Sequence, residues 1–205
     1  MRVAAAARWL HIYLSMFGLF AVLFFSVTGI TLNHPDWFGV EVERAEEFQG
    51  SLDPRWVKPP ATEPDTGGPE DAAAGVSRLE VVEHLRNTHH VRGALAAITA
   101  DETTCVVSFK GPGYAADAFI TREDGKYTLT ETTRGFVAVI NDLHKGRDSG
   151  PVWSVLIDVS AVLLTVASLS GLILLFYIKR RRIPGSVTAV VGTIVVLLIA
   201  YWLVP

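Results

Sequence analysis

The sequence predicts a membrane protein with three transmembrane helices and an extracytoplasmic α+β domain. Half of the 205 residues are apolar and the mean hydropathy is +0.34, which is high for a water-soluble chain of this length. Three apolar runs are long enough to cross a bilayer. An acidic segment with proline-rich and strand-like stretches lies between the first two runs, which is typical of an aqueous domain.

The apolar runs predict spans at residues 10–32, 152–178 and 187–204. At 1.5 Å per residue the first run covers roughly 34 Å and the third, the shortest, roughly 27 Å. Asn33-His34-Pro35 follows the first run where a cleavable leader would have a small-x-small cleavage site. We therefore interpret the first run as a permanent anchor.

Basic residues predict the orientation. Arg2 and Arg8 precede the first span, and Lys179–Arg182 separate the second span from the third, so the positive-inside rule places both groups in the cytoplasm of a bacterial inner membrane. The predicted order is a cytoplasmic N-terminus (1–9), the first span, an extracytoplasmic region (33–151), the second span, a basic cytoplasmic loop (179–186) and the third span.

Charge and cysteine content exclude several classes of protein. Residues 36–152 carry twenty acids and twelve bases, whereas the rest of the chain carries six bases and one acid. This distribution excludes a nucleic-acid-binding protein, because the bases are either outnumbered by acids or adjacent to apolar runs. A single cysteine, Cys105, excludes a disulfide scaffold, a four-cysteine zinc site and a cysteine-ligated iron–sulfur cluster.

The extracytoplasmic region is predicted to contain a linker and one small domain. Residues 52–75 hold five prolines and few large apolar side chains, which predicts a loop or linker. The domain is predicted at 76–135 and begins with a helix, because Ser77 and Glu80 have capping-box spacing and apolar residues then recur at helical intervals. Four short strands are predicted to follow, at 94–99, 104–109, 116–121 and 127–131.

Three motifs stand at the ends of the predicted spans: Arg8-Trp9-Leu10-His11 at the start of the first span, Thr28-Gly29-Ile30 near its end, and Asn141-Asp142-Leu143-His144-Lys145-Gly146 before the second span. Together they resemble the motifs of PepSY-associated transmembrane helix proteins (PepSY_TM-like). The resemblance implies that the helix and four-stranded meander form a PepSY domain. It also implies a membrane protein that passes electrons through haem b to ferric siderophores or other extracytoplasmic acceptors.

His34 and His144 are the first candidate ligands. Both are predicted on the extracytoplasmic side, where two neutral imidazoles on packed helices suit a six-coordinate haem iron or a copper ion. With the family resemblance we expect them to be the axial ligands of one haem b. The alternative is structural: His34 ends a helix before Pro35, and His144 bonds a backbone carbonyl.

His11 and Asp158 are polar residues inside predicted spans, where such residues are often functional. A second haem at His11 would need a second chain, a non-histidine ligand or an open iron position. Asp158 would carry a proton, accept hydrogen bonds from Ser26, Thr28 or Asn33, or remain a neutral acid. A face of small residues on the second span, which includes Ala167-x3-Gly171, predicts helix packing within the chain or in a homodimer.

His84, His89 and His90 are predicted to be solvated surface residues, since their spacing is not a common metal-ligand pattern. The functional hypothesis is therefore a small haem b electron-transfer or reductase subunit whose acceptor is a ferric chelate or a flavoprotein. Its expected partners are membrane lipid and a second copy or a larger redox complex. The alternative is a membrane-anchored regulatory protein whose domain binds a periplasmic partner such as a peptidase.

Overall fold

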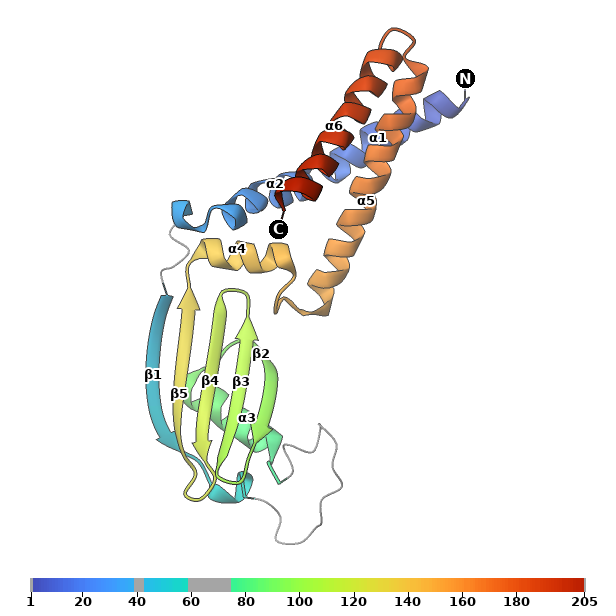
Figure 1. Ribbon diagram of the computed structural model, residues 1–205. Helices are drawn as coiled ribbons and strands as arrows, with labels where there is room; N and C mark the ends of the chain where they lie inside the picture. The colour runs from blue at the N-terminus through green and yellow to red at the C-terminus, as the bar shows by residue number, and fades with distance from the viewer. Residues whose placement is uncertain (1, 39–42, 59–74, 205) are drawn as a thin grey trace. The chain divides into compact units, whose positions relative to one another are not determined.

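The computed structural model describes residues 2–38, 43–58 and 75–204 (Figure 1). The chain forms two compact units. The helical unit comprises residues 1–25 and 155–205, and the sheet unit comprises residues 26–154. Most of the predicted linker, residues 59–74, lies outside the described residues.

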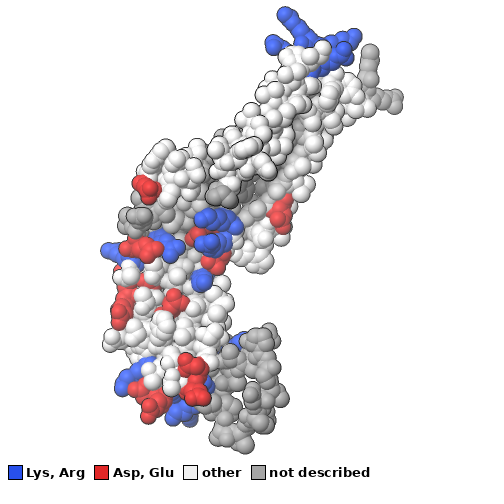
Figure 2. Space-filling view, in the orientation of Figure 1, with Lys and Arg blue, Asp and Glu red and all other residues white. Residues whose placement is uncertain are grey.

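Apolar helices dominate the helical unit. Helix α5 (Gly150–Tyr177) and helix α6 (Arg182–Leu203) have mean hydropathies of 2.4 and 2.3, and both are long enough to cross a membrane. Figure 2 shows basic side chains at one end of these helices and almost none along their length. The second and third predicted spans are therefore confirmed as apolar helices of spanning length.

The first predicted span is not one straight helix. Helix α1 (Arg2–Phe17) and helix α2 (Leu19–Asn33) meet at Gly18 and are bent by 58°. The Gly18 amide still donates to the Leu14 carbonyl at 2.9 Å, and the Gly18 carbonyl still accepts from Val22. A glycine at the break, which lowers helix propensity and adds no side chain, permits the bend without loss of these bonds. The pair forms a third span only if both helices count as one.

Small residues let the helices of the helical unit approach one another. Ala7 of α1 and Ala167 and Ser170 of α5 are all buried, as expected for the small-residue face of the second span. Between α5 and α6, a β-carbon added to Gly185 would collide with the Leu175 side chain. The packing that the sequence predicts at Ala167-x3-Gly171 is thus used within the chain.

An antiparallel sheet of five strands forms the centre of the sheet unit. Its strands are β1 (Glu43–Ser51), β2 (Ala94–Ala100), β3 (Thr104–Gly111), β4 (Tyr114–Thr121) and β5 (Lys126–Arg134), in the spatial order β1-β5-β4-β3-β2. The four predicted strands are confirmed with longer bounds. Strand β1 was not predicted, because Glu43–Ser51 is largely charged and exposed and has no apolar alternation. Its pairing with β5 places it at an edge.

Helix α3 (Arg78–His89) packs on one face of this sheet (Figure 1). Val81 and Leu85 of α3 are fully buried. Ser77 precedes the helix, but its side chain makes no capping hydrogen bond. The residues that face α3 alternate along each strand; they are Cys105, Val107, Phe109, Ala116, Ala118, Ile120 and Leu129. The opposite face stays open to solvent among the described residues, and Phe119 on it is 52% exposed.

The beginning of the predicted linker belongs to the core. Leu52 and Val57, on either side of the short helix η2 (Pro54–Trp56), are buried. Arg122, itself buried, donates from Nε to the Val57 carbonyl at 2.6 Å. The predicted linker boundary at residue 52 is therefore wrong, because proline content alone does not reveal that these two apolar side chains reach the sheet.

Helix α4 (Phe136–Lys145) connects the sheet to the end of α2 within the sheet unit. The Gly113 amide in the β3–β4 turn donates to the Asp142 carboxylate at 2.9 Å. From α2, the Thr31 hydroxyl donates to Asn141 Oδ1 at 2.6 Å, and both side chains are buried. After α2 the chain makes one turn of 3-10 helix, η1 (Pro35–Phe38).

Candidate functional site

His144 lies in the last turn of α4 and contacts the end of α2. Its Nδ1 is 2.5 Å from the Thr28 hydroxyl oxygen. A β-carbon added to Gly29 would lie 3.8 Å from its Cε1, so the ring rests on the glycine. The Trp153 indole donates to the Leu143 carbonyl at 2.8 Å and fixes the chain just after this turn. The imidazole is thus oriented by contacts from several directions.

His11 lies on α1 and contacts α5 in a similar way. Its Nδ1 is 2.9 Å from the Ala167 carbonyl oxygen and 3.2 Å from Ser170 Oγ. Because a carbonyl oxygen only accepts, Nδ1 must carry the proton, and in the neutral ring Nε2 then has a free lone pair. A β-carbon added to Gly171 would lie 3.0 Å from Cε1 of the ring, so a larger residue there would require the imidazole to shift by a few tenths of an ångström.

The two histidine contacts use the same local sequence. Ser26-Val27-Thr28-Gly29-Ile30 receives His144, and Ser168-Leu169-Ser170-Gly171-Leu172 receives His11. In each, a hydroxyl side chain lies beside Nδ1 and the following glycine makes room for the ring. The similarity of the two five-residue segments is visible in the sequence and would have predicted that each segment receives a histidine; this was not predicted.

His34 has different surroundings. Its ring stacks on Trp37 with centroids 3.8 Å apart and an interplanar angle of 6°. The Asn33 side-chain amide lies 3.3 Å from its Nε2. His34 follows the Thr28 position, against which His144 lies, by six residues, or about 9 Å along a helix axis. His34 therefore lies just beyond the end of α2, whereas His144 contacts α2 at Thr28.

Asp158 is exposed on α5. It makes no hydrogen bond or ion pair with any residue that the structure describes. Ser26, Thr28 and Asn33 belong to the sheet unit, so the hydrogen bonds expected from them stay a prediction. An exposed carboxyl group on an apolar spanning helix is costly in lipid.

The family resemblance implies haem b, so the surroundings of each histidine can be compared with what an iron-ligating histidine requires. A haem-ligating histidine usually coordinates through one ring nitrogen while the other donates to a protein acceptor. His11 fits this requirement, and His144 fits it in the tautomer that donates from Nδ1 to Thr28. His34 does not fit as well, because its Nε2 is engaged by Asn33 and one ring face is covered by Trp37.

Two histidines that were predicted to be solvated surface are instead partly buried. His84 and His89 of α3 both lie within hydrogen-bond distance of the Tyr127 hydroxyl on β5. Tyr127 is only 4% exposed. Burial and the neighbouring His84 lower the pKa of His89, and burial raises the pKa of Tyr127. His90 is exposed, as expected, and ends α3 in the left-handed conformation.

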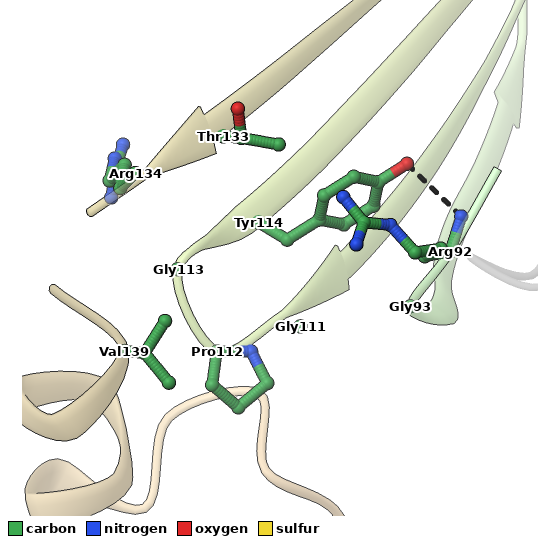
Figure 3. Close-up of a pocket in the computed structure, with 9 residues that line it drawn as sticks. All are labelled: Arg92, Gly93, Gly111, Pro112, Gly113, Tyr114, Thr133, Arg134 and Val139. Atoms are coloured by element: carbon green, nitrogen blue, oxygen red, sulfur yellow. Dashed lines mark hydrogen bonds between the residues drawn. The ribbon is translucent and has the colours of Figure 1, made fainter. Parts of the chain in front are cut away.

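A pocket of about 330 Å³ lies at the β3–β4 turn, between strands and α4 (Figure 3). The Arg92 guanidinium covers the Tyr114 ring at 5.2 Å, and the Arg92 amide donates to the Tyr114 hydroxyl at 3.1 Å. Arg134 also lines the pocket but pairs with Glu43 at 2.7 Å. Burial raises the pKa of the Tyr114 hydroxyl in this pocket, and no histidine or carboxylate among the lining residues stands beside it as a base, so the histidine contacts remain the candidate site.

The comparisons with known proteins agree with the motifs in the sequence. The family model described as "Putative PepSY_TM-like" matches residues 5–205, which is nearly the whole chain. No curated protein and no solved structure matches the chain. The resemblance that the three sequence motifs indicate is thus confirmed, and the chain belongs to the Putative PepSY_TM-like family of membrane proteins.

Proposed function

We propose that this protein is a haem b-binding electron-transfer subunit in which His144 and His11 are the iron ligands. One observation carries the proposal: each imidazole is held through Nδ1 by a partner helix and rests on a glycine of that helix. This arrangement fixes the orientation of both rings, as the supporting contacts of a metal-ligating histidine do, and leaves Nε2 of His11 for a metal. The pairing of His34 with His144 that the sequence predicts is replaced by two separate sites.

The second imidazole at each iron comes from a second copy of the chain. The helical unit contains a single histidine, His11, so it cannot supply two imidazoles by itself. The unpartnered carboxyl group of Asp158 on the same unit also favours association with another chain. In a two-fold symmetric dimer, the His11 side chains of the two copies would bind one iron and the two His144 side chains would bind the other.

When bound, haem would supply a one-electron couple at each histidine. The role of the protein's own residues is to orient the imidazoles and to keep water from them, and no nucleophile or general base is required. With Lys179–Arg182 on the cytoplasmic side, His11 lies near the cytoplasmic face and His144 near the periplasmic face of an inner membrane. Electrons would pass outward to a ferric chelate or a flavoprotein.

Haem content per chain tests the proposal. The wild-type protein, purified after expression with ample haem, should hold one haem per chain, and His11→Ala and His144→Ala should each hold about half. His34→Ala is the matched control and should keep the wild-type content. Wild-type protein that has no Soret absorbance, even after reconstitution with haem, would contradict the proposal.

The open face of the sheet favours a second function, in which the sheet unit binds a periplasmic protein such as a peptidase. Phe119 lies exposed at its centre, and next to it the Ser108 hydroxyl donates to Asp117 at 2.5 Å. Exposed apolar residues on a polar surface are typical of recognition sites. Phe119→Asp should abolish co-purification of such a partner and leave haem content unchanged.

A further inference from the structure

His84, His89 and Tyr127 of the sheet unit lie close together, and neither histidine is one of those proposed to bind haem. Nε2 of His89 lies 2.9 Å from the Tyr127 hydroxyl oxygen, and Nε2 of His84 lies 3.4 Å from the same oxygen. We propose that these three side chains form a binding site for a divalent transition-metal ion of the Cu²⁺ and Zn²⁺ class.

The convergence is not a simple result of helix periodicity. Residues five apart on an α-helix point about 140° away from each other around the axis. His84 and His89 nevertheless turn the same ring nitrogen to one phenol oxygen. Both rings stand nearly perpendicular to the Tyr127 ring, at 85° and 88°, with ring centroids 5.9 Å and 5.7 Å from it.

The spacing of the donor atoms suits a small ion. With metal–ligand distances of about 2.0–2.1 Å, tetrahedral ligands lie about 3.3 Å from one another. The observed separations of 2.9 Å and 3.4 Å differ from this value by a few tenths of an ångström. Among the described residues, no three His, Cys, Asp or Glu side chains form a metal site, so the tyrosine oxygen is the third ligand here. Water completes the fourth position.

The surroundings hold the ligands in place. Trp56 lies against His84 with ring centroids 5.8 Å apart, and Phe48 lies against His89 at 5.2 Å. Tyr127 is almost fully buried, whereas both histidines are partly accessible to an incoming ion. This arrangement combines a rigid phenol with two imidazoles that solvent can reach.

Gly50 on β1 also positions Tyr127. A β-carbon at Gly50 would lie 2.5 Å from the tyrosine hydroxyl, so the strand backbone passes directly beside the phenol. Burial lowers the pKa of His89, which keeps its imidazole neutral and able to bind a metal. Glu131, which pairs with Arg92 at 3.8 Å, is close enough to raise the pKa of His89 slightly against the effect of burial and would offset part of the ion's charge.

Binding exchanges one proton for one ion. In the metal-free site, Tyr127 donates to one Nε2 and accepts from the Nε2–H of the other ring. The ion needs a lone pair on both Nε2 atoms, so the second ring moves its proton to Nδ1. The tyrosine then binds as phenolate and releases its proton to solvent, as metal-bound ligands generally do.

Copper titration of the full-length protein in detergent tests the proposal. Equilibrium dialysis should show one more bound Cu²⁺ per chain in the wild type than in a His84→Gln, His89→Gln double variant. The difference spectrum against the same metal-free sample should show a visible phenolate-to-Cu²⁺ charge-transfer band, which Zn²⁺ removes by competition.

Two further variants make the result decisive. Tyr127→Phe removes a single oxygen and should lose the charge-transfer band. If the double variant does not fold, the comparison of wild type with Tyr127→Phe decides the result. His90→Asn keeps a residue that tolerates the left-handed conformation and should bind copper as the wild type does. A band that persists in Tyr127→Phe, or equal copper binding by wild type and double variant, would overturn the proposal. Haem content, measured on the same samples, should not change.

Discussion

Nδ1 of His11 on α1 lies 2.9 Å from the Ala167 carbonyl oxygen on α5, within one turn of the glycine against which the ring rests. The carbonyl oxygen stays accessible to a side chain because Ala167 and Gly171 are small. His144 makes the corresponding contact with Thr28 and Gly29. Two positions in the chain thus hold an imidazole by the same means, and several predictions depend on it.

Gly171→Ala should displace His11. The new β-carbon would lie 3.0 Å from the imidazole, so the ring has to move by a few tenths of an ångström, which weakens its bond to Ala167. We expect about half of the bound haem to be lost, measured as haem per chain. Gly192→Ala on α6 is the control, since nothing lies within 4 Å of its added β-carbon. Equal haem content in both variants would show that the His11–Gly171 contact has no role in haem binding.

Thr28→Val should weaken haem binding at His144. The substitution keeps the shape of the side chain but removes the hydroxyl that lies 2.5 Å from Nδ1. Loss of such a supporting hydrogen bond lowers metal-site affinity by about 10–100-fold. The rate of haem transfer to an excess of apomyoglobin measures the effect. Thr31→Val, which loses the bond to Asn141 instead, should transfer haem at nearly the wild-type rate.

A cysteine at Asp158 should form an intermolecular disulfide if the second copy covers this position. The native Cys105 is buried and does not interfere. Asp158→Cys should cross-link in oxidised membranes, as seen by non-reducing electrophoresis. Val159→Cys lies about 100° further around the helix and is the control. Cross-linking that is equal at both positions, or absent at both, would argue against this interface.

The stability of the sheet unit should fall in mild acid. Burial holds the pKa of His89 below its ordinary value of 6.5, so the unfolded chain binds a proton at higher pH than the folded chain. Stability is therefore full above about pH 6.5 and decreases as the pH falls below it. Thermal unfolding in metal-free buffer from pH 8 to pH 5 measures this. His89→Gln should flatten the profile, and His90→Asn should leave it unchanged.

Gly113→Ala should destabilise the contact between the sheet and α4. Gly113 has φ +65°, and an added β-carbon would lie 2.5 Å from Cγ2 of Val139 on α4. Strain of this kind costs about 1–3 kcal/mol, and the clash adds to it. The thermal midpoint of unfolding reports the loss. Gly135→Ala has nothing within 4 Å and an ordinary φ, so it should remain close to the wild type. A similar midpoint for both variants would contradict the assigned role of Gly113.

Local patterns predicted the strands of the α+β domain but not all of its core. The alternation from Cys105 to Phe109 identifies β3, because one face of the strand is buried and the other is not. Strand β1 has no such alternation and is held by backbone pairing with β5, which the sequence does not encode locally. Val57 likewise packs in the core, and Arg122, distant in sequence, binds its carbonyl.

The sequence by itself determined the class of the protein: the length of its apolar runs requires a membrane, the basic residues between the last two predict an orientation, and the motifs identify the family. Tertiary structure decided which polar side chains meet. His144 lies against Thr28, and His84 and His89 share Tyr127, because helix packing and strand pairing bring together residues that are far apart in the chain. Periodicity describes only neighbours along one element, so such partners become visible only after the elements have packed.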